Sequence, residues 1–259
     1  LLFPMLYNSF SFLLFFPIVA TFFFLLPHKI RQGYLLVVSY FFYMNWSPTY
    51  SLFLVFVTLV SYVGAQILQK FCESENDKLR RVVLASTLLL CFSGLFIFKY
   101  LNFLNDSLWG LFSLMGIRME VPHLELLLPV GISFYTFQAC GYMIDVYRRQ
   151  IMVERNFCTY ALFISFFPQI AAGPIGRGKE LLPQFKVKHY LNREDITTGL
   201  RWMLWGYFMK VVVADRLALY TDAVFGNIAH HTGGSILVAA VLFTFQIYCD
   251  FAGYSFIAL

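Results

Sequence analysis

The sequence contains little charge for its length. Only 13% of its 259 residues are Asp, Glu, Lys or Arg, against about 25% in soluble domains, whereas 59% are hydrophobic and 31 are Phe. This scarcity of charge excludes a disordered chain, which needs high charge and low hydrophobicity. It also argues against a soluble domain, whose surface needs more charge to stay dispersed. The mean hydropathy of +0.69 indicates a protein whose solvent is mostly lipid.

The sequence also lacks the patterns of disulfide, metal and hydrolase chemistry. Its 5 cysteines are scattered and form no C-x-x-C pair, which argues against a disulfide scaffold and a thiolate metal site. Neither an H-E-x-x-H nor a G-x-S-x-G pattern occurs, and no complete catalytic constellation is present. We therefore assign no metal ligand and no catalytic residue to this chain.

Apolar runs recur along the whole chain. They predict an all-α, polytopic membrane helix bundle, one membrane domain over residues 1–259, with about six crossings and one or two re-entrant or tilted pieces. The runs are Phe10–Leu26, Tyr34–Trp46, Tyr50–Leu68, Val82–Tyr100, Leu126–Tyr147, Phe157–Ile170, Thr197–Val213 and Ser235 to the C-terminus. The sixth is too short to cross and is expected to dip in and return, ending at Pro168. A separate interfacial helix over Asn102–Gly116, anchored by Trp109, is expected at the outer surface.

The basic residues predict the orientation in the membrane. If the loop that holds Lys29 and Arg31 faces the cytoplasm, most of the 19 Lys and Arg residues fall inside, and the N-terminus lies outside. Lys210 then falls on or near the outer side. This asymmetry accounts for the net charge of +5, so no nucleic-acid partner is expected. Asn192 followed by Asp195 before an apolar run predicts a helix start.

The last apolar run places polar groups where lipid is expected. Gln246 and Asp250 are four residues apart, so they share one face of a helix, and Tyr254 follows them by another four. These side chains either form the polar wall of a buried tunnel or build an interhelical hydrogen-bond cluster. The sequence favours neither alternative.

Two earlier segments also break the apolar pattern. Pro129 and Gly131 interrupt the run that leads to Gln138, and broken helices at membrane depth either line a cavity or pack on protein. Residues 173–179 loosely fit a phosphate loop, but Glu180 stands where that motif needs a hydroxyl, so we reject this interpretation. Arg177 remains free to meet a phosphate or a helix end, or is a plain positive-inside residue.

Four ordered motifs resemble the membrane-bound O-acyltransferase (MBOAT) family, in particular the bacterial branch that acetylates exported polysaccharides such as alginate. The motifs are Leu128–Gln138 with Ile144–Arg148, Phe166–Arg177, Trp205–Asp215 and Phe245–Ser255. Within the last motif, Asp-Phe-Ala-Gly-Tyr-Ser looks more like the proteins that transfer D-alanyl groups to teichoic acids. The resemblance covers nearly the whole chain, but this departure leaves the acceptor polymer open.

The resemblance implies acyl transfer through a transmembrane tunnel. A thioester donor, acetyl-CoA or an acyl carrier, would enter from the cytoplasmic face and acetylate hydroxyls of an exported polysaccharide, and no bound cofactor is implied. The family histidine, in a Trp-His-Gly-type motif, has no counterpart here, so we expect the N-terminal portion of a longer protein with an incomplete MBOAT fold. Gln138, Gln246, Asp250 and Tyr254 are then candidates for lining the tunnel or substrate, and Arg177 is a donor-side candidate.

The resemblance also implies surroundings and partners. It places the chain in the bacterial cytoplasmic membrane, with the lipid bilayer, the donor or its carrier, and the exported polysaccharide or an extracytoplasmic acetyltransferase as partners. Two other hypotheses stay open. Secondary transporters also use broken helices with buried polar groups, although no paired repeats are visible here. A truncated, non-catalytic scaffold is the second.

Overall fold

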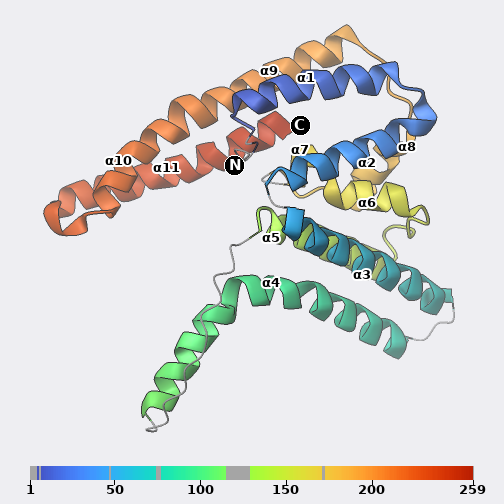
Figure 1. Ribbon diagram of the computed structural model, residues 1–259, viewed down its shortest axis with the longest axis horizontal. Coiled ribbons are helices and arrows are strands. Elements are labelled where there is room, and N and C mark those ends of the chain that lie inside the picture. The colour runs from blue at the N-terminus through green and yellow to red at the C-terminus, as the bar shows by residue number, and fades with distance from the viewer. Residues whose placement is uncertain are drawn as a thin grey trace. The chain divides into compact units, whose positions relative to one another are not determined.

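The computed structural model describes residues 5, 7–46, 48–73, 77–114, 129–170 and 173–258. Within these ranges the chain consists of helices and their connections, with no strand (Figure 1). The chain divides into two compact units. The first takes in Leu1–Val38, Phe167–Pro174 and Lys188–Leu259, and the second Ser39–Phe166 and Ile175–Val187. An all-α fold is therefore confirmed, whereas a single membrane domain stays a prediction.

The first unit is built from helices at both ends of the chain. They are α1 (Phe10–Leu25), the first part of α2 (His28–Met44), α7 (Phe167–Ile170), α9 (Arg193–Tyr207), the π-helical turn η1 (Phe208–Ala214), α10 (Asp215–Phe225), the 3-10 turn η2 (Ile228–His230) and α11 (Gly233–Ala258). Asn192 caps α9 by accepting a hydrogen bond from the Glu194 amide at 3.1 Å, and Glu194 and Asp195 lie in its first turn. The predicted helix start at Asn192 is confirmed.

A long helical hairpin dominates the first unit. Arg193 to Phe225 run as one helical rod of about 50 Å at 1.5 Å per residue, and α11 returns beside it (Figure 1). The stacked rings of Trp202 and Phe256 join the two arms near one end, and an edge-to-face contact between Phe225 and Phe243 joins them near the other. The rod is much longer than the apolar run Thr197–Val213 that predicted it, because its polar flanks are helical too.

The second unit contains the middle of the chain and includes a short, mostly buried helix, α6 (Phe157–Ser165). The other elements of this unit are the rest of α2, α3 (Pro48–Glu73), α4 (Asp77–Leu114), α5 (Ile132–Tyr147) and α8 (Gly178–Lys186). In α6 every residue from Thr159 to Ser165 is buried, as expected for a helix that is apolar on all sides. The run Phe157–Ile170 was expected to end at Pro168, but α6 already ends at Ser165. Pro168 lies instead in the first turn of α7, where a missing N–H costs nothing.

Two other boundaries differ from the sequence-based expectations. The run Leu126–Tyr147 is helical only from Ile132, because Pro129 precedes the start and Gly131 takes the left-handed conformation (φ 72°). The helix expected over Asn102–Gly116 is present as far as Leu114, but it is the end of α4 and not a separate helix, since no proline interrupts α4. Its place at the outer surface stays a prediction. The side chain of Trp109, the expected anchor, and residues 115–128 lie outside the described residues.

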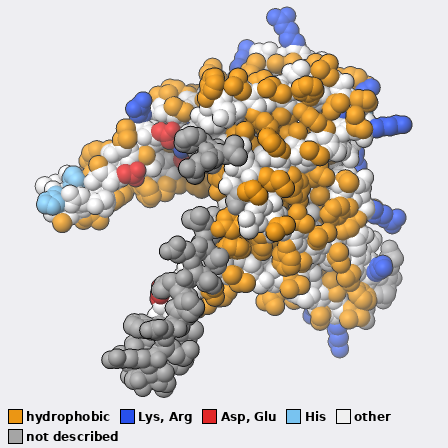
Figure 2. All heavy atoms as spheres, viewed as in Figure 1, with side chains coloured by type: hydrophobic (Ala, Val, Ile, Leu, Met, Phe, Trp, Pro, Cys, Tyr) orange, Lys and Arg blue, Asp and Glu red, His pale blue; other side chains and the backbone are white. Residues whose placement is uncertain are grey.

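The surface of the helices suits lipid. Pro48–Phe71, Asp77–Ser107 and Gly233–Ala258 are long and apolar enough to cross a membrane, and Phe10–Leu25 and Phe157–Ile170 are shorter apolar segments. Hydrophobic side chains cover much of the face seen in Figure 2. Exposed apolar surface on this scale is unfavourable in water and normal in a bilayer. The chain is therefore a membrane protein, and the count of about six crossings stays a prediction.

Candidate functional site

The five residues singled out in the sequence fall into two groups. Gln246, Asp250 and Tyr254 lie on α11 in the first unit, whereas Gln138 on α5 and Arg177 before α8 lie in the second. Each group forms its own site.

The site in the first unit is a charged cluster built around Lys210. The Lys210 Nζ lies 2.8 Å from Asp215 Oδ1 and 2.5 Å from Asp250 Oδ1, and 5.2 Å from the centre of the Tyr254 ring. The Lys210 side chain is only 13% exposed. A charged side chain inside a membrane protein needs partners. Here the Lys210 ammonium group contacts two carboxylates and the face of an aromatic ring.

The backbone of the hairpin brings these groups together. A Cβ atom at Gly206 would lie 2.6 Å from the carbonyl oxygen of Gly253, so α9 and α11 touch backbone to backbone there. One turn later, Lys210 sits in η1, whose end is marked by a hydrogen bond from the Asp215 amide to the Lys210 carbonyl. π-Helical turns are rare and often occur at functional sites. The close crossing thus places Lys210 against Asp250 on the opposite arm.

A second polar contact joins the two arms of the hairpin further along. The Thr221 hydroxyl of α10 donates a hydrogen bond to Gln246 Oε1 at 2.5 Å. Gln246 and Asp250 therefore both face the rod, as their spacing predicts. The contacts provide the interhelical cluster that was one of the two alternatives, and the lining of a tunnel by these residues stays a prediction.

The sequence interpretation missed Lys210 as a member of this site. It placed Lys210 on or near the outer side because the apolar run stops at Val213, whereas the rod continues to Phe225 and leaves Lys210 in its middle. The sequence did indicate this role, because a lysine inside an apolar helix needs a buried counter-charge, just as Asp250 does.

Tyrosines tie the chain's N-terminal segment to the same site. The Tyr7 ring packs edge-on against the Tyr254 ring, with 5.7 Å between centroids. Its hydroxyl donates to the Phe167 carbonyl at 2.6 Å, and the Tyr207 hydroxyl donates to the Tyr7 carbonyl at 2.7 Å. Tyr254 is thus held between Lys210 and a buried Tyr7.

The site in the second unit is a cavity of about 560 Å³ between α5 and the start of α8. Its lining includes Gln138, Gly141, Asp145, Arg148 and Arg177, so it brings together the two predicted residues of this unit. Gln138 is buried, and its Nε2 donates to the Phe163 carbonyl at 2.8 Å, which joins α5 to α6. The amide of Gln138 therefore anchors the wall of the cavity.

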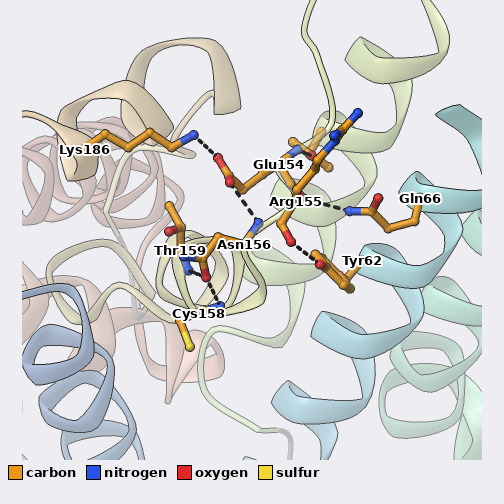
Figure 3. Close-up of polar contacts among 9 residues, drawn as sticks. Tyr62, Gln66, Glu154, Arg155, Asn156, Cys158, Thr159 and Lys186 are labelled. Carbon is orange, nitrogen blue, oxygen red and sulfur yellow. Dashed lines mark hydrogen bonds and ion pairs between the residues drawn. The ribbon is translucent and has the colours of Figure 1, made fainter. Parts of the chain in front are cut away.

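Glu154, a buried residue in the connection between α5 and α6, makes polar contacts with several segments of the second unit (Figure 3). Glu154 forms an ion pair with Lys186 of α8 at 2.5 Å, and its other oxygen accepts from the Asn156 amide at 3.0 Å. The backbone amide of Glu154 donates to the hydroxyl of Tyr142, a lining residue on α5. Gln66 of α3 fixes the same segment by donating to the Glu154 carbonyl at 2.9 Å. The connection between α5 and α6 therefore links α5 to α8.

Comparison with known proteins covers both sites. No family model matches the chain. It is 34% identical over 257 residues to a Pseudomonas aeruginosa protein named "Probable alginate O-acetylase AlgI", covering 98% of this chain and 48% of that protein. Its identity to the Azotobacter vinelandii protein of the same name is 35% over 259 residues, covering 98% and 50%. These alginate O-acetylases, which match 98% of the chain, belong to the MBOAT family.

The family match extends beyond the alginate proteins. The peptidoglycan O-acetyltransferase of Helicobacter pylori is 32% identical over 252 residues, covering 87% of this chain and 46% of that protein. The chain spans about half the length of the curated relatives it matches. The alginate matches cover 98% of the chain, so they extend over the segments that hold the Lys210 cluster and the α5–α8 cavity.

Proposed function

We propose that this chain is part of a membrane O-acetyltransferase that moves acetyl groups from a cytoplasmic thioester donor to hydroxyls of an exported polysaccharide. The observation that supports the proposal is the homology along 98% of the chain to proteins named for alginate O-acetylation. A relative named for peptidoglycan O-acetylation supports the same chemistry on another exported polymer. We place the protein in the bacterial cytoplasmic membrane, where donor and acceptor lie on opposite faces.

The proposed reaction is a simple acyl exchange. The acceptor hydroxyl oxygen attacks the thioester carbonyl, a C–O bond forms, the C–S bond breaks, and the hydroxyl proton passes through a general base to the leaving thiolate. The family resemblance assigns the base to a histidine that has no counterpart among the motifs of this chain. A positioned base contributes about 10² to 10⁴ in rate, and holding both reactants together contributes further. In this scheme Asp250 and Tyr254 orient reacting groups from the α11 wall, and acetyl-CoA or an acyl carrier supplies the acetyl group.

Substitution of Asp250 tests the role of the charged cluster. We expect Asp250→Ala in the complete protein to abolish transfer of radiolabelled acetyl groups from acetyl-CoA to polysaccharide in membrane vesicles. Asp222→Ala is the matched control, because Asp222 lies exposed on α10 of the same hairpin. Wild-type transfer by Asp250→Ala would remove Asp250 from the site. The proposed function would be overturned if the wild-type protein transferred no acetyl groups to alginate or to peptidoglycan, with either acetyl-CoA or an acyl carrier as the donor.

A further inference from the structure

We infer that the cavity between α5 and α8 is a binding site for a phosphate ester, with Arg148 and Arg177 as its anion-binding groups. The volume of about 560 Å³ lies within the range of about 300–1,000 Å³ that small-molecule sites occupy. The two arginines come from the end of α5 and from the residue before α8, so they reach the cavity from two different elements.

The charge of the lining favours an anion. The charged residues of the lining are Arg148, Arg177 and one acid, Asp145, and within the described residues none of these three side chains forms a hydrogen bond or an ion pair. Two unpaired guanidinium groups therefore outnumber the one acid. Planar guanidinium groups bind phosphate oxygens through paired hydrogen bonds, which makes arginine the preferred residue for phosphate recognition. A cation site needs several oxygen ligands of negative charge, which this lining does not offer.

The backbone around the cavity supports the same ligand. Arg177 precedes the first residue of the nine-residue helix α8 and provides no side-chain cap for the amides of the first turn. Gly176 and Gly178 line the cavity at this point. Free amides at a helix start and the positive end of the helix dipole both attract phosphate groups.

The end of α5 fixes Arg148 at the cavity. The Gln150 amide donates to the Asp145 carbonyl at 2.9 Å, and Arg149 adopts a left-handed conformation (φ 59°), which closes the helix. The chain thus turns away from α5 immediately after Arg148. Glu154 contacts both Tyr142 of α5 and Lys186 of α8, so the elements next to the two exposed arginines are linked through one residue.

The α5 wall also leaves room for the ligand. A Cβ atom at Gly141 would meet no atom within 4 Å, so open space borders the middle of α5. A larger side chain at this position should fill the cavity without displacing protein atoms. Gly199 of α9 is a matched position, because a Cβ atom there also meets nothing within 4 Å, yet it lies outside the cavity.

The phosphate has two chemical sources that binding experiments can separate. One is a soluble thioester donor of the CoA type, and the other is the headgroup of a membrane phospholipid. For the first, we would measure binding of CoA and of phosphate-free pantetheine to the protein in maltoside detergent. For the second, we would titrate phosphatidylglycerol and phosphate-free diacylglycerol and count bound lipids by native mass spectrometry. We expect a preference of at least about tenfold for the phosphate-bearing compound in one of these pairs.

Variants link that preference to the cavity. We expect Arg148→Gln and Arg177→Gln each to weaken binding about tenfold, which corresponds to about 1.4 kcal/mol. Gly141→Leu should reduce binding by steric filling, whereas Gly199→Leu should bind as the wild type does. The inference is overturned if neither pair shows a preference for phosphate, or if the two arginine variants and Gly141→Leu bind as the wild type does. The test reads binding alone, so its failure leaves the proposed acetyl transfer standing.

Discussion

The Lys210 side chain interacts with three other side chains at once. Its ammonium group is the shared partner of Asp215 and Asp250 and also lies over the Tyr254 ring. Removal of one member of a buried ion pair leaves an uncompensated charge, which costs more than the pair itself contributes. Lys210 is therefore the residue on which the electrostatic balance of the hairpin depends.

Substitution of Lys210 should expose this dependence. We expect Lys210→Met to lower the free energy of unfolding by about 1–3 kcal/mol. The cost stays below that of a fully buried pair because the Asp215 and Asp250 side chains are 41% and 36% exposed to solvent or lipid. Thermal unfolding in detergent, followed by tryptophan fluorescence, measures the change. Adding Asp250→Asn to Lys210→Met should recover part of the loss, and equal stability of Lys210→Met and the wild type would contradict this account.

At the scale of the elements, the contact between α9 and α11 decides the geometry of the cluster. Gly206 and Gly253 let the two backbones touch, so Lys210, which follows Gly206, meets Asp250, which precedes Gly253 on the antiparallel arm. Small residues at helix crossings serve the same purpose throughout membrane proteins.

Two alanine substitutions in one helix test this contact. Gly206→Ala should lower the free energy of unfolding by about 1–3 kcal/mol, because its Cβ atom would lie 2.6 Å from the Gly253 carbonyl oxygen and force the arms apart. Gly199→Ala should instead raise stability by about 0.5–1 kcal/mol, because alanine favours the helix and meets nothing there. Melting temperatures of the two variants in the same detergent give the comparison. A Gly206→Ala protein as stable as Gly199→Ala would show that the crossing is not close.

At the scale of the molecule, the basic loops predict the orientation in the membrane. The predicted inner loops include the turn between α1 and α2 and the segment before α9. Arg31, which is buried, donates to the His189 carbonyl at 2.7 Å and to the Leu26 carbonyl at 3.0 Å, so these two segments meet. Segments that meet in this way lie on the same side of the membrane, as the positive-inside rule requires of both.

Cysteine labelling tests the orientation. In a variant without the 5 native cysteines, a cysteine at Thr232, exposed between α10 and α11, should react with a membrane-impermeant maleimide in intact cells. A cysteine at Lys188, exposed between α8 and α9, should react only after lysis. These results follow if the N-terminus lies outside and the basic loops inside. The opposite labelling pattern would reverse the orientation.

The features that depend on local sequence are the ones the sequence by itself determined. Scarce charge and long apolar runs suffice for an all-α membrane protein, because lipid leaves helices as the simplest way to satisfy the backbone. The start of α9 at Asn192 and the common face of Gln246 and Asp250 follow from capping and from helical periodicity. The four motifs likewise identify the family without any coordinates.

Only the tertiary structure decided which polar groups meet. Lys210 and Asp250 are 40 residues apart and pair because two glycines let antiparallel helices touch, and no local pattern encodes that distance. In the same way, Arg148 and Arg177 line one cavity because the fold brings the end of α5 beside the start of α8. Helical periodicity sets the direction in which a side chain points along its own helix. The partner it meets is set by the packing of helices that are distant in sequence, and that packing exists only in the folded chain.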